Sequence, residues 1–191
     1  MLKLLAKGFL RWNGWEPEGE LPPERSFVLV SAPHTSNWDF VYLLALASVY
    51  GIRLRWIGKH TLFMWPFGGL MRFLGGVSID RRSRQNMVEQ VCEAFRTRPD
   101  LIIAVPPEAT RSRAEHWKTG FYYMALGAKV PIVLGFLDYK RRRGGFGPSF
   151  HPSGDIDADM KKIRDFYQNI TGKHPEHFGP IRIKPPVEAR S

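Results

Sequence analysis

The chain has 191 residues, of which 43% are hydrophobic, and its formal net charge is +10 at pH 7. This length predicts one domain with a sizeable core, and the apolar content excludes an intrinsically disordered protein. The charge favours partners that carry phosphates or acidic groups, namely nucleic acid, anionic membrane or acidic protein, without choosing among them. The single cysteine, Cys92, excludes an internal disulfide.

Residues 2–12 predict an amphipathic helix. Its apolar face would carry Leu2, Leu5, Phe9 and Trp12, and its basic face Lys3, Lys7 and Arg11. This pattern fits an interfacial helix on an anionic membrane, and equally a first helix that packs its apolar stripe on the domain. No run reaches the roughly 20 apolar residues that span a bilayer. Because residues 16–25 are rich in proline, glutamate and glycine, we expect an amphipathic segment and linker over 1–25 and a domain over 26–191.

Downstream, short apolar runs alternate with helical patterns. The predicted strands are 26–32, 54–56, 77–79, 101–105 and 130–137, and of these 26–32 and 101–105 are apolar runs typical of buried strands. The patterns typical of helices are 40–50, 85–98, 121–128 and 160–170. This alternation predicts a single α/β domain in which helices flank a central, largely parallel mixed sheet. In such sheets, functional sites gather at the carboxyl ends of the strands.

Two segments leave more than one interpretation open. Residues 60–76 gather large apolar side chains around Pro66, Gly68 and Gly69, and form either a short core helix or a surface that faces lipid or an acyl chain. The basic run 140–143 predicts a turn, which would also suit a binding module for membranes or nucleic acid.

The first candidate for chemistry follows a predicted strand directly, in the run His34-Thr35-Ser36-Asn37-Trp38-Asp39. Histidine is suited to take a proton near neutral pH, and a carboxylate on its other ring nitrogen would fix the tautomer and stabilise the imidazolium. The same spacing has a structural alternative, because Ser36 and Asp39 resemble a capping box in which Asp39 only caps the next helix.

Arginines supply the second candidate. Arg81 follows one predicted strand, and the run Pro107-Glu108-Ala109-Thr110-Arg111-Ser112 follows another. The planar fork of arginine matches phosphate, although each arginine alone could be a solvated surface residue. Thr110 could donate to a phosphate or close a turn, and Glu108 could orient the arginines or the loop. No metal site is predicted, because Pro175 argues against a helical ligand pair formed by His174 and His177.

Taken in chain order with 76–81 and 130–133, these segments resemble the 1-acylglycerol-3-phosphate acyltransferase family, glycerolipid acyltransferases with a His-x4-Asp motif. The resemblance covers Phe27–Tyr139. It implies a glycerolipid acyltransferase-like fold and transfer of a fatty acyl group from acyl-CoA or acyl carrier protein to a hydroxyl of a lysophospholipid or glycerol-phosphate-type acceptor, without a further cofactor. His34 would be the general base and Asp39 its partner. The acceptor would be bound by Arg81, Glu108, Thr110 and Arg111.

The chain departs from the family at three positions. Ala109 stands where the family usually has glycine, Pro106 where an aromatic residue is common, and Leu134 where a second proline often ends the fourth motif. These changes are compatible with the reaction type that the resemblance implies, and they leave the identity of the acceptor open.

The resemblance implies an enzyme of phospholipid biosynthesis, peripheral on the cytoplasmic face of an anionic membrane. Two other classes stay open. An acyl thioesterase or lipid hydrolase would need a nucleophile elbow, and Gly-x-Ser-x-Gly is missing from the sequence. A non-catalytic basic membrane-binding module would not need both His34 and Asp39. Nucleic acid is not expected as a partner, because the aromatic residues lie in apolar clusters and not among basic residues.

Overall fold

A seven-stranded sheet forms the centre of the computed structural model, which describes residues 2–58, 60–78 and 84–185. The strands are β1 (Glu16–Glu18), β2 (Phe27–Ala32), β3 (Leu54–Gly58), β4 (Gly76–Ser78), β5 (Ile102–Val105), β6 (Ile132–Asp138) and β7 (Arg143–Phe150). Their order is β1-β7-β6-β2-β5-β3-β4. The pair β6–β7 is antiparallel and the other described pairs are parallel, which confirms the predicted α/β domain.

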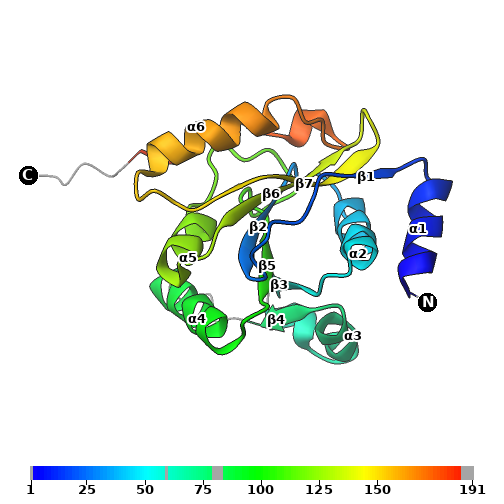
Figure 1. Cartoon of the computed structure of the whole chain (residues 1–191), viewed down its shortest axis with the longest axis horizontal. Coiled ribbons are helices and arrows are strands. Elements are labelled where there is room, and N and C mark those ends of the chain that lie inside the picture. The colour runs from blue at the N-terminus through cyan, green and yellow to red at the C-terminus, as the bar shows by residue number, and fades with distance from the viewer. Residues whose placement is uncertain (1, 59, 79–83, 186–191) are drawn as a thin grey trace, which may run out of the picture.

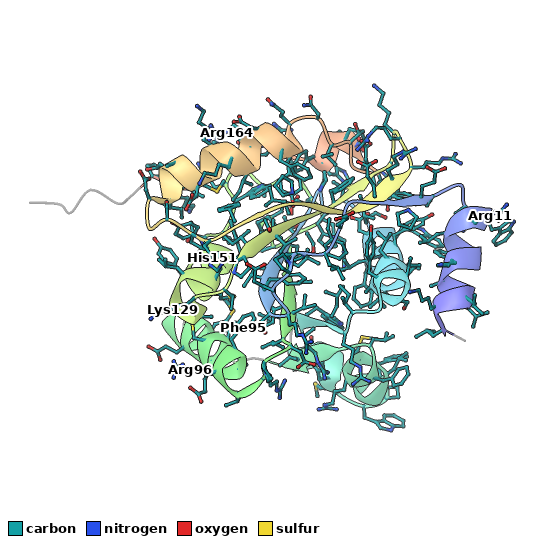
Figure 2. All side chains as sticks on the ribbon, in the orientation of Figure 1. Arg11, Phe95, Arg96, Lys129, His151 and Arg164 are labelled. Atoms are coloured by element: carbon teal, nitrogen blue, oxygen red, sulfur yellow. The ribbon has the colours of Figure 1, made fainter. Side chains whose placement is uncertain are left out.

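Helices cover both faces of the sheet (Figure 1). One face carries α1 (Leu2–Trp12), α2 (Trp38–Tyr50) and α3 (Gly68–Phe73), and the other carries α4 (Arg84–Thr97), α5 (Gly120–Ala128) and α6 (Ile156–Tyr167). Short 3-10 turns lie at His60–Phe63 and Pro175–His177. Charged side chains such as Arg11, Arg96, Lys129 and Arg164 lie on the outer sides of these helices (Figure 2).

The central strand β2 shows why its sequence is a continuous apolar run. Successive side chains of a strand point to opposite faces, and here both faces are covered. Val28 and Val30 pack in the core under α4, α5 and α6, whereas Phe27 and Leu29 pack under α2. The same double coverage buries every residue of β6, so the two strands form the buried middle of the domain.

The edge of the sheet differs from the sequence prediction. Residues 16–25 were expected as a linker, but Glu16–Glu18 form β1 and pair with β7. Strand β7 was not predicted either, because its three glycines and one proline are uncommon in strands. The basic turn 140–143 is part of the hairpin that joins β6 to β7.

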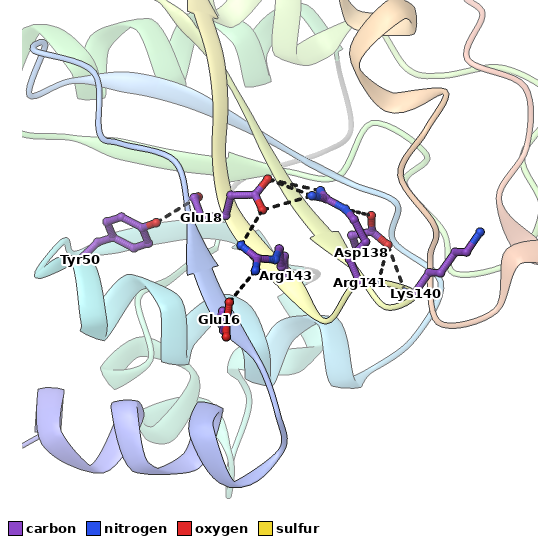
Figure 3. Close-up of polar contacts among 7 residues, drawn as sticks. All are labelled: Glu16, Glu18, Tyr50, Asp138, Lys140, Arg141 and Arg143. Atoms are coloured by element: carbon purple, nitrogen blue, oxygen red, sulfur yellow. Dashed lines mark hydrogen bonds and ion pairs between the residues drawn. The ribbon is translucent and has the colours of Figure 1, made fainter.

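Ion pairs stabilise the edge of the sheet at which β1 pairs with β7 (Figure 3). Arg143 lies 2.7 Å from Glu16 and 3.5 Å from Glu18, and Arg141 lies 3.2 Å from Glu18 and 2.7 Å from the buried Asp138. Two arginines of the basic turn are therefore engaged by carboxylates, which reduces the free positive charge there.

Both apolar segments bury some of their side chains in the core and expose others. On α1, Ala6 and Leu10 pack against α2, whereas Leu2, Leu5 and Trp12 are exposed. In the aromatic segment, Phe63 is buried and its ring lies 5.9 Å from that of Trp56 on β3. The exposed apolar side chains of that segment are Met64, Trp65, Phe67, Leu70 and Phe73. Across 2–58, 60–78 and 84–185, the structure has no helix of the length and apolarity needed to cross a membrane.

Candidate active site

Three adjacent strands bring the polar residues of the candidate site together. The order β6-β2-β5 places the carboxyl ends of three parallel strands side by side. His34 follows β2, Glu108 follows β5 and Tyr139 follows β6. This is the edge at which open α/β sheets bind their ligands. The prediction that both chemical segments lie at strand ends is confirmed for the described residues.

His34 and Asp39 form a pair. The Nδ1 atom of His34 lies 3.3 Å from Oδ2 of Asp39, and the imidazole keeps 20% of its surface exposed. Because the carboxylate faces Nδ1, the tautomer with hydrogen on Nδ1 is favoured. The other nitrogen, Nε2, is then available to accept a proton from a bound molecule.

Asp39 faces both the loop before α2 and His34. Its Oδ2 accepts hydrogen bonds of 2.8 Å from the backbone N–H groups of Thr35 and Ser36, whereas the N-cap residue of α2 is Asn37 and not Ser36 as the capping-box interpretation expected. The same carboxylate also faces His34. Burial alone would raise the pKa of Asp39, but hydrogen bonds from His34, Tyr139 and Ser36 outweigh it and hold the pKa below its usual value. The group is thus a carboxylate at neutral pH.

Glu108 lies beneath this loop. Its side chain is 4% exposed, and its Oε1 accepts a 3.0 Å hydrogen bond from the backbone N–H of His34. Burial raises the pKa of Glu108 to about 7, although the bond from His34 opposes the rise. In sequence this residue alone would be taken as exposed. The structure shows it supporting the His34 loop, and it does not line the cavity described below.

The turn after β5 carries the other predicted residues. Ala109 adopts a left-handed φ of 57°, a conformation that glycine adopts more readily, which gives a physical reason for glycine at this family position. Thr110 Oγ1 accepts a 3.2 Å hydrogen bond from the N–H of Ser112, so it does close the turn. Thr110 and Arg111 are exposed and line the cavity. Arg81 lies outside the described residues.

A cavity of about 850 Å³ adjoins the pair and extends between the strand ends and the helices. Its polar part includes His34, Asp39, Thr110, Arg111 and Lys118. Its apolar wall includes Leu29, Leu43, Leu46, Trp56, Met71, Met124 and Phe146. Sites for small molecules typically enclose about 300–1,000 Å³ with a few convergent polar groups, so this cavity can hold a long apolar ligand with a polar end.

Neither Lys118, which lines the cavity, nor Tyr139 was predicted from the sequence. The hydroxyl of Tyr139 donates a 2.6 Å hydrogen bond to Oδ1 of Asp39, from a position 100 residues further along the chain. The available signal was that Tyr139 directly follows a predicted strand. Within the described ranges, no group of three or more His, Cys, Asp or Glu side chains is placed to hold a metal ion.

These features define a class of enzyme site: a histidine and carboxylate pair at the strand ends of an α/β sheet, beside an apolar cavity with an exposed arginine. The family model described as Acyltransferase matches residues 17–133, which is more than half of the chain. The protein therefore belongs to the acyltransferase family, and the matched region contains His34, Asp39, Glu108 and Arg111. No curated protein gives a significant match to the sequence.

Proposed function

We propose that the protein transfers a fatty acyl group from acyl-CoA or acyl carrier protein to a hydroxyl of a lysophospholipid or glycerol-phosphate-type acceptor, with His34 as general base. The observation that carries the proposal is the 3.3 Å approach of His34 Nδ1 to Asp39 at the polar part of an apolar cavity. An acyl chain needs the apolar wall, and the acceptor hydroxyl needs the base.

The reaction balances without a covalent enzyme intermediate. His34 Nε2 takes the proton of the acceptor hydroxyl while that oxygen attacks the thioester carbonyl carbon. The tetrahedral intermediate collapses as the carbon–sulfur bond breaks, and the imidazolium returns the proton to the thiolate that leaves. Asp39 stabilises the imidazolium between these steps, as expected of a carboxylate on the other ring nitrogen.

The residues proposed to bind the acceptor are supported by their charge and exposure. In this proposal Arg111 and Thr110 receive the anionic end of the acceptor, which is supported by their exposure and by their place in the cavity lining. Arg81 has the same proposed role from the resemblance alone. Glu108 supports the His34 loop and does not contact the acceptor in this proposal.

A lipid acceptor implies a membrane surface. The exposed apolar residues of α1 and of the segment around α3, together with the basic residues of α1, suit an anionic bilayer. We place the protein on the cytoplasmic side of such a membrane as a peripheral enzyme of phospholipid biosynthesis.

The test is an acyl-transfer assay with labelled palmitoyl-CoA or palmitoyl carrier protein and a panel of acceptors. The panel holds lysophosphatidic acid, glycerol 3-phosphate, other lysophospholipids and water alone. His34→Ala should lower the rate about 10²- to 10⁴-fold, the usual contribution of a general base. His151→Ala is the matched control, because that histidine is exposed and pairs with Glu24 away from the cavity. Fast hydrolysis with water alone, and no product with any acceptor, would instead identify a thioesterase.

A further inference from the structure

Tyr139 lies where it can act on the catalytic pair through Asp39. Its hydroxyl donates to Asp39 Oδ1, whereas Oδ2 faces His34 and the two loop amides. Both oxygens of the carboxylate are thereby held, and the plane of the group is fixed. Burial and the bond to Asp39 raise the pKa of Tyr139 well above its ordinary value, so the hydroxyl stays a donor over the working pH range.

The phenol ring is itself held in place. Trp15 meets it edge-on with ring centroids 4.9 Å apart, and Tyr42 does so at 5.9 Å. Trp15 and Tyr42 stack on one another at 4.3 Å. The backbone N–H of Tyr139 donates to the carbonyl of Thr171 at 2.9 Å. A ring fixed on these sides presents its hydroxyl in one direction.

We infer that Tyr139 is a positioning residue of the catalytic pair: it sets the orientation and the effective charge of Asp39, and through Asp39 the basicity of His34. The inference rests on the proposed roles of His34 and Asp39. Trp15 lies between α1 and β1, so the N-terminal segment contacts the tyrosine ring whose hydroxyl binds Asp39.

The hydrogen bond from Tyr139 lowers the negative charge that Asp39 presents to His34. The titratable groups that face Asp39 are His34, Tyr139 and Glu108, and Tyr42 faces Tyr139. Among them, Tyr139 draws electron density from the carboxylate through its hydrogen bond. Without that bond Asp39 is a stronger acceptor for the Nδ1–H of His34, and the imidazolium is stabilised. The titration midpoint of the His34 imidazole should therefore move to higher pH in Tyr139→Phe.

The experiment compares Tyr139→Phe with Tyr50→Phe in the full chain. Tyr50 is a matched control, because its hydroxyl donates to the carbonyls of Glu18 and Gly19 and its ring packs edge-on against Phe146. Histidine NMR titration without substrate follows the His34 imidazole, assigned with His34→Gln. Kinetics use palmitoyl-CoA with lysophosphatidic acid and with each other acceptor of the panel.

For Tyr139→Phe we expect the His34 midpoint to rise and kcat to fall about tenfold, with each KM changed less than about twofold. Tyr50→Phe should change neither. When Asp39→Asn is already present, adding Tyr139→Phe should lower kcat little further, because both substitutions act through the Asp39 carboxylate. An unmoved or lower midpoint, or equal losses in both tyrosine variants, overturns the inference.

Two further outcomes are separable. If wild-type protein transfers no acyl group but its His34 midpoint still rises in Tyr139→Phe, the proposed function fails and the positioning role stands. If Tyr139→Phe does not fold, 3-fluorotyrosine at position 139 keeps the ring and makes the hydroxyl a stronger donor. The midpoint should then fall, and an unmoved midpoint would overturn the role.

Discussion

At the scale of single residues, Glu108 has the most unusual environment in the site. It is buried, its Oε1 accepts a hydrogen bond from the His34 backbone, and its Oε2 has no hydrogen-bond partner among the residues that the structure describes. A buried carboxylate with few partners is costly, so folding favours the protonated form. The pKa of about 7, against 4.5 for an ordinary glutamate, expresses this preference.

Stability should therefore fall as pH rises through this window. Between pH 4.5 and 7 the folded protein keeps a proton on Glu108 that the unfolded chain releases, so the free energy of unfolding decreases with pH. The full decrease is about 3 kcal/mol above pH 7. Glu108→Gln keeps an oxygen acceptor and never ionises. Urea unfolding from pH 4.5 to 8 should show the variant gaining about 2–3 kcal/mol on wild type. If the free energy of unfolding of the two proteins depended on pH in the same way, Glu108 would be ionised in the folded protein over this range.

Arg111 gives a second prediction at this scale. If it binds the anionic end of the acceptor, Arg111→Ala should raise the acceptor KM about 10- to 100-fold, because a hydrogen bond to a charged group contributes about 1.5–3 kcal/mol. The donor KM should change less. Arg113→Ala is the control, since Arg113 is also exposed but pairs with Glu115 at 3.5 Å. Equal effects of Arg111→Ala on both substrates would contradict the assignment.

At the scale of elements, one glycine next to β1 and another inside α1 have opposite steric surroundings. Gly19, directly after β1, has a φ of +87°, and a Cβ there would lie 1.7 Å from the carbonyl oxygen of Phe146. A Cβ on Gly8, in the middle of α1, would have no described atom within 4 Å apart from its chain neighbours and the backbone of its own helix. The first position requires glycine, and the second only weakens a helix.

Alanine should consequently have opposite effects at the two positions. Gly19→Ala should destabilise the protein by at least about 2 kcal/mol, because it adds backbone strain and forces β1 away from β7. Gly8→Ala should stabilise it by about 0.5–1 kcal/mol through helix propensity. Urea unfolding measures both values. If Gly19→Ala were neutral, β1 would contribute no stability to the sheet edge.

The elements also show how far the sequence could predict the fold. Strands β2, β5 and β6 are continuous apolar runs because both faces are covered, and such runs were identified. Strand β1 has three residues, two of them charged, and it is held by ion pairs and by partners more than 120 residues away. The sequence around β1 therefore does not reveal which distant residues it pairs with.

In the candidate site, too, some residues could be predicted from the sequence and others could not. His34 and Asp39 are five residues apart, and their motif could be recognised. Tyr139 reaches Asp39 because β6 lies beside β2, and Trp15 reaches the Tyr139 ring because the N-terminal segment returns to the sheet. The orientation of Glu108 toward the His34 backbone likewise depends on the neighbouring strands β2 and β5.

At the scale of the whole molecule, the exposed apolar side chains are concentrated on one side of the sheet. Trp12 is 88% exposed on α1, and Trp65 and Phe73 are 93% and 85% exposed around α3. These helices share the face of α2, whereas α5 on the other face exposes only Tyr123 and Leu126 in part (Figure 1). We propose that the α1–α3 side rests on the membrane that supplies the acceptor.

Liposome sedimentation tests this orientation. Binding to anionic vesicles should exceed binding to neutral ones and weaken with salt, since each nearby lysine or arginine adds about 1 kcal/mol. Replacing Trp65, Phe67 and Phe73 with serine should reduce binding and activity on bilayer lipid, yet spare activity on a monomeric short-chain acceptor, because these side chains lie outside the core. Phe63 must be left intact, as it is buried. The control is Tyr123→Ser with Leu126→Ser on the opposite face. If the control weakens binding as much as the triple variant, or wild type does not bind at low salt, the α1–α3 side does not rest on the membrane.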